Sequence, residues 1–280
     1  MPTTYAHWAF GRDCLNRMPG QLQEIVTKHR DIYDFGVHGP DILFYYLPNP
    51  KVDKLGIKMH MTSASVVFSN FKKSFDRFKD KDEMLAYILG YLTHFTLDSE
   101  CHTYVEAKRK HSNITHNRVE AQWDRHQMLI DGKTPNLVDR AESLKPSKAN
   151  AKVISYFYPY KEKEVLKYLK YQKAIVTLSN AISPRKEKAY RYVLNKLKQY
   201  SYADIFIGFE EFEECKDSNL RLDKLRKKAL NRFPKLLKEL LAYLYEDKKL
   251  GKYFENNFED RKNEKVDVLS YKDELSYIVK

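Results

Sequence analysis

Residues 84–102, MLAYILGYLTHFTLDSECH, contain the most apolar stretch of this 280-residue sequence, and three polar side chains recur at every fourth position toward its end. The apolar residues recur at intervals of three and four, which is typical of a buried α-helix, and we expect a helix over residues 82–108. His94, Asp98 and His102 stand at i, i+4 and i+8, so they should project from one side of this helix. Because the same periodicity dominates the whole chain and period-two alternation is almost absent, the sequence predicts an all-α fold.

The rest of the chain is divided by capping and breaker residues. Thr62 or Ser63 is a plausible N-cap, and Pro184 and Pro234 stand where helix starts are expected. Glycine and proline predict loops at 36–40 and 47–50. The expected further helices are 63–78, 115–130, 161–180, 184–199, 220–232 and 234–247. A polar stretch, 131–150, is the expected connection between a first part, 1–130, and a basic helical second part, 151–280, which we expect to pack on the first part as one domain.

Composition and charge indicate a folded globular protein with a basic second half. With 42% hydrophobic residues, 31% charged residues and only 9 Gly and 10 Pro, the chain is a folded globular protein rather than a disordered or low-complexity one. Its net charge is +12, and residues 151–280 carry 29 Lys and Arg against 20 Asp and Glu, whereas residues 1–150 carry 21 against 18. This basic half favours an anionic partner, either a membrane surface or a nucleic acid, without choosing between them.

Three further observations concern location. Cys14, Cys101 and Cys215 show no CxxC spacing, which favours a reducing compartment. The N-terminal residues lack the basic and apolar regions of a secretion signal. The most apolar stretch, 84–97, is shorter than the roughly 20 residues that span a bilayer. We therefore expect a cytoplasmic protein.

The histidines predict a metal site. All nine lie within the first 126 residues. His116 and Glu120 repeat the i, i+4 pairing, and two imidazole–carboxylate pairs on adjacent helices in apolar surroundings make a cage for zinc. The alternative is a buried polar network without metal, for which nothing would balance the desolvation cost. The spacings of di-iron bundles, HD phosphohydrolases and zincins are absent.

An ordered set of eight residues resembles the zinc-dependent phospholipase C family, which also includes glycosylphosphatidylinositol-specific phospholipase D and is akin in fold to the fungal single-strand nucleases. The local sequences Ala6-His7-Trp8 and Gly39-Pro40-Asp41 agree with this resemblance. It covers about residues 2–130, which makes 1–130 the expected zinc-binding catalytic core. The set is His7, Asp41, His60, His94, Asp98, His102, His116 and Glu120.

The resemblance implies up to three zinc ions and a role for each residue of the set. Asp98 would bridge the first and second ions, a water activated between the metals would attack phosphorus, and Asp41 would accept its proton. Removal of Met1 would let the amine of Pro2 complete the second site. The implied ligands are Asp41, His60, His94 and Asp98 for the first ion, Asp98 and His7 for the second, and His102, His116 and Glu120 for the third.

We therefore expect a zinc-dependent phosphodiester hydrolase that cleaves a phospholipid with phospholipase C regiochemistry. A nuclease or nucleotidase using the same site is one alternative, and a catalytically lapsed, zinc-stabilised binding module is another. His38 could orient a ligand or lie on a loop surface, and we expect structural or solvated roles for His29, His111 and His126. Four aromatic residues are candidates for either a substrate pocket or, more often at such spacing, the core: Tyr45, Tyr46, Phe68 and Phe71.

Overall fold

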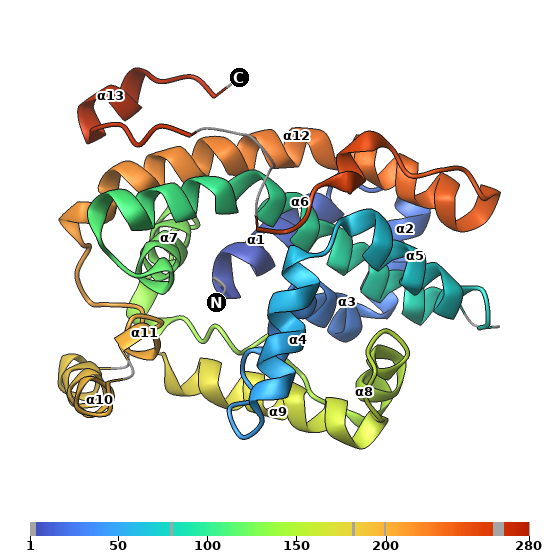
Figure 1. The fold of residues 1–280 in the computed structure, drawn as a ribbon, viewed down its shortest axis with the longest axis horizontal. Coiled ribbons are helices and arrows are strands. Elements are labelled where there is room, and N and C mark those ends of the chain that lie inside the picture. Colours follow the sequence, from blue (N-terminus) through green and yellow to red (C-terminus); the bar gives the residue numbers. More distant parts are fainter. Residues whose placement is uncertain (1–3, 79–80, 181–182, 199, 260–265, 280) are drawn as a thin grey trace.

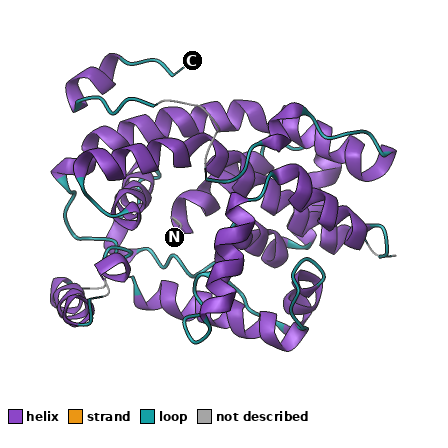
Figure 2. Ribbon diagram, viewed as in Figure 1, coloured by secondary structure: helices purple, strands orange, loops and turns teal. Residues whose placement is uncertain are grey.

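The computed structural model describes residues 4–78, 81–180, 183–198, 200–259 and 266–279. These residues form helices joined by turns, without a strand among them, which confirms the all-α prediction (Figure 2). The α-helices are α1 (Thr4–Leu15), α2 (Gly20–Lys28), α3 (Arg30–Gly36), α4 (Pro50–Met61), α5 (Ala64–Phe75), α6 (Asp82–Ser112), α7 (His116–Ile130), α8 (Lys148–Ser155), α9 (Glu162–Leu178), α10 (Pro184–Lys196), α11 (Tyr200–Ala203), α12 (Lys216–Glu246) and α13 (Tyr271–Ser276). Short 3-10 helices are η1 (Gly39–Leu43), η2 (Pro135–Leu137), η3 (Glu213–Cys215) and η4 (Lys252–Glu255).

Helix α6 is the centre of the molecule, and α1, α3, α7 and α12 pack around it (Figure 1). Its aromatic residues Tyr87, Tyr91 and Phe95 are fully buried. The helix ends at Asn113, whose left-handed conformation, with φ 51°, is a common way to terminate a helix. The expected helix over 82–108 is thus confirmed and runs one turn longer.

Close contact between α3 and α6 depends on two glycines. A Cβ on Gly36 would lie 3.0 Å from the Cα of Gly90 and 3.1 Å from the amide nitrogen of Tyr91. Any larger residue at Gly36 would therefore push the two backbones apart. This crossing matters for function, because the chain continues from α3 directly into η1, which carries Asp41.

One prediction about the second half is wrong. Instead of separate helices at 220–232 and 234–247, residues Lys216–Glu246 form the single helix α12, with Pro234 inside it. An internal proline removes one backbone hydrogen bond and clashes with the preceding turn. Here Pro234 is exposed, while its neighbours Phe233, Leu236 and Leu237 are buried. The packing of this apolar face, on both sides of the proline, outweighs the local cost.

The other expected helices are confirmed with small changes at their ends. Helices α5, α7, α9 and α10 correspond to the predictions 63–78, 115–130, 161–180 and 184–199. Thr115 caps α7, since its hydroxyl accepts a hydrogen bond of 3.1 Å from the amide of Arg118. The loop predicted at 36–40 is only partly correct, because Gly39 and Pro40 begin η1. Proline suits this position, as its fixed φ is already helical.

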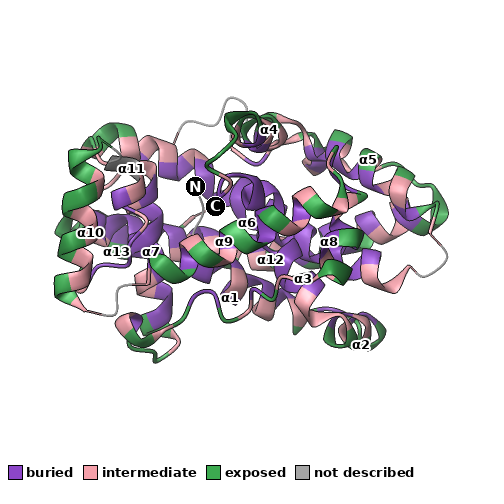
Figure 3. Ribbon diagram, turned by 90° about the horizontal axis from the view of Figure 1, so that it is seen from below, coloured by how far each residue is buried: buried purple, intermediate pink, exposed green. Residues whose placement is uncertain are grey.

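Burial is uneven along the chain. Figure 3 shows buried residues concentrated along α6 in the middle of the molecule. Helix α10, by contrast, has no buried residue. Among the described residues, no helix combines the length and the apolar character that crossing a membrane requires.

Candidate metal centre

Five elements bring the eight predicted site residues together around α6. Seven of them are buried, and the eighth, His116, keeps about a fifth of its side chain exposed. The three positions His94, Asp98 and His102 lie on one side of α6, as their spacing predicted. The others come from α1 (His7), η1 (Asp41), α4 (His60) and α7 (His116 and Glu120).

The carboxylate of Asp98 faces imidazoles on both of its oxygens. Its Oδ2 lies 2.9 Å from Nε2 of His94 and 3.9 Å from Nε2 of His60. Its Oδ1 lies 3.1 Å from Nε2 of His7 and 3.5 Å from Nε2 of His102. Asp98 is therefore placed between two groups of histidines, which is the arrangement that a bridging carboxylate needs.

Asp41 joins the group around His60 and His94. Its Oδ1 lies 3.0 Å from Nε2 of His60, and its Oδ2 lies 3.8 Å from Nδ1 of His94. Gly39, two residues earlier, makes this approach possible. It has a φ of +50°, which disfavours side chains, and a Cβ there would overlap the imidazole of His94. The Gly-Pro-Asp sequence thus serves to bring a carboxylate up to α6.

A separate group forms where α6 meets α7. Oε1 of Glu120 lies 3.1 Å from Nε2 of His102 and 3.0 Å from Nε2 of His116. The two imidazole rings are 5.2 Å apart and nearly perpendicular, at 74°. Three ligand atoms of the types that zinc prefers converge here.

The position of His7 depends on a buried carboxylate of α7. Oδ2 of Asp124 accepts a hydrogen bond of 3.1 Å from the amide of Tyr5, and Oδ1 accepts one of 2.7 Å from the amide of Ala6. Asp124 thereby caps the first turn of α1. Burial raises the pKa of Asp124 to about 6, although Arg140 nearby acts to lower it. Sequence spacing gave no sign of this residue.

The separations of the donor atoms are near those of a zinc site. Ligand atoms about 2.0–2.2 Å from a tetrahedral zinc lie about 3.3–3.5 Å from one another. The nitrogen–oxygen distances above run from 2.9 to 3.9 Å, so small shifts of these side chains would bring them into this range. His60 is also oriented correctly, because its Nδ1 is 2.8 Å from the carbonyl oxygen of Gly56, which leaves Nε2 for a metal. The residues present therefore fit zinc.

Three sets of residues within the described chain could each hold an ion. In each set, the ligand atoms lie within 4.8 Å of one another. The sets are His7, Asp41 and His94; His60, His94 and Asp98; and His102, His116 and Glu120. The third agrees with the grouping implied by the family resemblance. The first differs, because it groups His7 with Asp41 and His94, although His7 also approaches Asp98.

Burial and mutual attraction set the charges of the cluster. Burial alone would raise the pKa of Asp98, but His102, His94 and His7 hold it well below its usual range. Burial likewise acts to lower the pKa of His7, and Asp98 outweighs it, so that the pKa is raised. Burial prevails at His94, whose pKa is lowered. A bound cation would therefore replace the protons of those imidazoles whose pKa is raised, such as His7.

The remaining histidines lie in four different environments. His38 is buried rather than at a loop surface, and burial lowers its pKa to about 3, so its imidazole is neutral. Nε2 of His126 is 2.7 Å from Oδ2 of Asp223 on α12. Nδ1 of His29 is 3.7 Å from Glu83, and His111 is exposed. None of the four belongs to the three sets above.

The four aromatic candidates mostly lie in the core. Tyr45, Phe68 and Phe71 are buried, and Tyr46 packs against Tyr168 with ring centroids 4.8 Å apart. Met1 and Pro2 lie outside the described residues, so the proposal about the amine of Pro2 has no structural counterpart here.

Sequence reasoning missed two residues near the C-terminus. Phe258 is fully buried, with its ring centroid 5.9 Å from those of both His60 and His94. Oε2 of Glu259 lies 3.5 Å from Nδ1 of His102. No spacing in the sequence connects these residues with the motifs before residue 130, so only the fold reveals their position.

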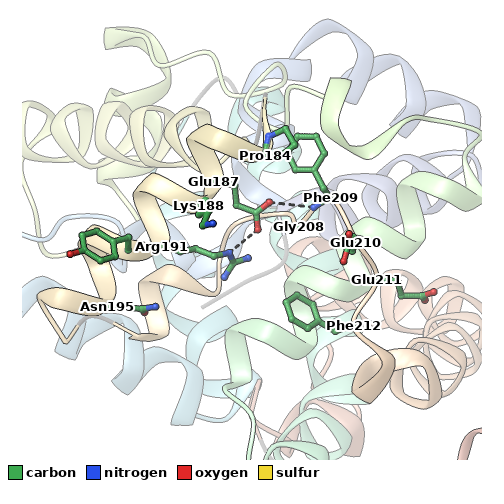
Figure 4. A pocket seen from close by; sticks show the side chains of 11 residues that line it. Pro184, Glu187, Lys188, Arg191, Asn195, Gly208, Phe209, Glu210, Glu211 and Phe212 are labelled. Carbon is green, nitrogen blue, oxygen red and sulfur yellow. Dashed lines mark hydrogen bonds and ion pairs between the residues drawn. The ribbon is translucent and has the colours of Figure 1, made fainter.

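Two surface cavities lie away from these residues, next to α10. A cavity of about 600 Å³ separates α10 from residues 208–212 (Figure 4). Glu187 lies in its wall and accepts hydrogen bonds from Arg191, at 2.7 Å, and from the amide of Phe209, at 3.3 Å. A second, mainly apolar cavity of about 460 Å³ lies on another side of α10, next to Leu178 and Phe206. None of the eight predicted site residues lines either cavity.

Comparison with known proteins identifies the family. A family model described as zinc dependent phospholipase C matches residues 6–173. No curated protein and no solved structure matches the chain significantly. The matched region contains all eight site residues and ends within α9, before α12 and the C-terminal segment. Because the match covers more than half of the sequence, the chain belongs to the zinc-dependent phospholipase C family.

Proposed function

We propose that this protein hydrolyses the phosphodiester bond of a phospholipid, with phospholipase C regiochemistry, at a centre of up to three zinc ions. The observation that carries the proposal is the position of Asp98, whose two oxygens face different groups of histidines. A structural ion pair needs only one such contact. A carboxylate shared between two groups is what a multi-metal hydrolase requires.

We propose the assignment of ligands that the family resemblance implies. Asp41, His60, His94 and Asp98 would hold one ion, and Asp98 and His7 would hold a second. His102, His116 and Glu120 would hold a third. When bound, zinc would neutralise the phosphate oxygens and make a water molecule nucleophilic at neutral pH.

The residues around the proposed centre then have different roles. The carbonyl of Gly56 keeps the proton of His60 on Nδ1, so that Nε2 stays available. Asp41 would accept the proton that the attacking water loses. Phe44 and Phe258 flank His60, with ring centroids 5.1 and 5.9 Å from it, and keep bulk water from this side of the centre. A drier site strengthens every charge interaction inside it.

The partner and the location belong to the same proposal. The basic second half suits a phosphate-bearing substrate, which we propose to be a phospholipid, or the anionic surface of a membrane. The absence of a CxxC spacing among the three cysteines supports a cytoplasmic location. Fractionation of the source cells tests the location directly.

One experiment separates the functional alternatives. The purified protein is analysed for zinc and then assayed in parallel on phosphatidylcholine vesicles, single-stranded DNA and a chromogenic phosphodiester, each with wild type and Asp98→Asn. We expect bound zinc and activity on phosphatidylcholine that the substitution abolishes. Activity on DNA alone would indicate a nuclease, and zinc without any activity would indicate a binding module. A protein without zinc, or equal activity in the variant, refutes the proposal.

A further inference from the structure

Residues 251–259, here called the C-terminal strap, cross the metal centre from the far end of the chain. They follow α12 and lie outside the region that the family model matches. Within the strap, Phe254 is fully buried, with its ring 5.6 Å from those of Phe68 and Phe95. The strap is therefore part of the core around α6, although it has little regular structure.

Backbone and side-chain hydrogen bonds fix the strap on both sides of the centre. The amide of Phe258 donates to the carbonyl oxygen of His60, at 2.9 Å, and the amide of Ala64 donates to that of Asn256, also at 2.9 Å. The hydroxyl of Tyr253 donates to Oε1 of Glu100 on α6, at 2.7 Å. These contacts attach the strap to α4, α5 and α6, and so determine where the next residue, Glu259, lies.

Glu259 faces the outer side of His102. On the inner side, Nε2 of His102 points to Glu120 and Asp98, at 3.1 and 3.5 Å. On the outer side, Nδ1 is buried and makes no hydrogen bond within the described part of the chain. The nearest carboxylate oxygen recorded there is Oε2 of Glu259, 3.5 Å away. The imidazole thus lies between carboxylates on both sides, two at Nε2 and one at Nδ1.

The comparison with His60 shows what this arrangement does. His60 uses its outer nitrogen, Nδ1, to bind the carbonyl of Gly56, which leaves Nε2 facing the cluster. A histidine that binds a metal almost always donates its other ring N–H to a carboxylate, a backbone carbonyl or water. That hydrogen bond fixes the tautomer and makes the metal-facing nitrogen more basic. His102 needs such an acceptor, and Glu259 is the residue in place to provide it.

We propose that Glu259 is a positioning residue for the third metal site. Its carboxylate accepts a hydrogen bond from the Nδ1–H group of His102, and this directs Nε2 toward the ion. The inference rests on the proposed function, because it requires that His102, His116 and Glu120 bind zinc. It assigns to the strap a role in metal binding. The third site then consists of residues from α6, α7 and a segment that follows α12.

Metal affinity tests this inference without relying on activity. Wild type, Glu259→Gln and Glu259→Asp are titrated with a competing chelator, and the zinc that remains on each chain is counted. Glu255→Gln is the matched control, since Glu255 is an exposed carboxylate in the same strap. Loss of an outer-shell partner typically weakens metal binding about 10- to 100-fold. We expect Glu259→Gln to lose one class of zinc by this factor, Glu259→Asp to recover part of it, and Glu255→Gln to match wild type.

The outcomes separate the two proposals. Wild type without zinc would refute the proposed function. Wild type with zinc, together with Glu259→Gln of equal affinity at every site, would overturn the inference alone. Circular dichroism of the metal-free proteins shows whether each variant is still folded. If a folded Glu259→Gln protein loses affinity equally at every zinc site, or if Glu259→Asp recovers nothing, the positioning role is wrong.

Discussion

Helices α6 and α12 have the same length, 31 residues, and lie against one another, yet they differ in almost every other respect (Figure 1). Helix α6 is buried on nearly all sides and holds three of the proposed ligands. Helix α12 has one buried apolar face, while Lys227, Lys235 and Lys238 on its other side are exposed. These exposed lysines of α12 need no partner because water solvates them. The charges of α6 persist only where other groups compensate the cost of burial.

Two ion contacts join these helices: Lys108 of α6 pairs with Asp217 of α12, at 2.6 Å, and a second contact clarifies their roles. Arg232 of α12 donates a hydrogen bond of 2.6 Å to Glu100 of α6, and Lys228 lies 3.6 Å from the same carboxylate. Both cations of this second contact come from α12 and the buried acid from α6. Helix α12 therefore supplies stability and counter-charge, whereas α6 supplies the chemistry. This division of roles between α6 and α12 can be tested on each helix.

The largest effect is expected on α6. Replacing Asp98 with Asn removes the negative charge that faces both groups of histidines, so zinc should be lost and activity should fall by a factor of about 1,000 or more, which corresponds to several kcal/mol of transition-state stabilisation. Steady-state kinetics and metal analysis measure both quantities. The control is Asp247→Asn at the end of α12, where the side chain is 86% exposed and asparagine tolerates the left-handed backbone. Wild-type activity in Asp98→Asn would contradict the division.

The next prediction concerns the core side of α12. Phe233 is fully buried, and truncation to Ala should lower the free energy of unfolding by about 3–5 kcal/mol through lost burial and a cavity. The folded variant should still bind the full complement of zinc, because Phe233 lies on α12, which carries none of the proposed ligands. Urea denaturation measures the first quantity and metal analysis the second. Zinc loss in a folded Phe233→Ala protein would show that α12 shapes the centre. Lys238→Ala, on the exposed face, should change stability by less than about 0.5 kcal/mol.

A substitution one residue further along should have the opposite sign. Pro234 is exposed within α12, so Pro234→Ala restores a backbone N–H and removes the clash with the preceding turn. The gain should be up to about 3 kcal/mol, reduced by the greater freedom that alanine gives to the unfolded chain. Urea denaturation checks this value. An unchanged or lower stability would mean that the proline itself helps α12 to pack along α6.

These two helices also show what the sequence could predict. The ligands on α6 were predictable because a helix turns repeating spacing into proximity, and four residues correspond to about one turn. The helix break expected at Pro234 was wrong. The burial of Phe233, Leu236 and Leu237 outweighs the local cost of a proline inside a helix. Glu259 and Asp124 were not predictable, since their partners are distant in sequence and have no periodic relation to them. Local spacing thus predicted the proposed ligands on α6 and α7, the family resemblance supplied His7, Asp41 and His60, and the fold revealed the residues that orient them.

The smallest expected effect concerns the pH dependence of the contact between α7 and α12. Burial acts to lower the pKa of His126, but the hydrogen bond and charge of Asp223 outweigh it, so the pKa is raised above 6.5. A raised folded-state pKa means that the ion pair stabilises the protein fully below about pH 6.5 and that this contribution is lost as the pH rises through the folded-state value. Wild type should therefore be more stable than His126→Gln by up to about 1 kcal/mol at pH 5.5, and the difference should shrink toward pH 8.5. Urea denaturation of both proteins across this range measures the difference, and the titrating groups that they share cancel. A constant difference would show that His126 acts through packing alone, and a change in zinc content would mean that the contacts of α12 extend to the chemistry of the centre.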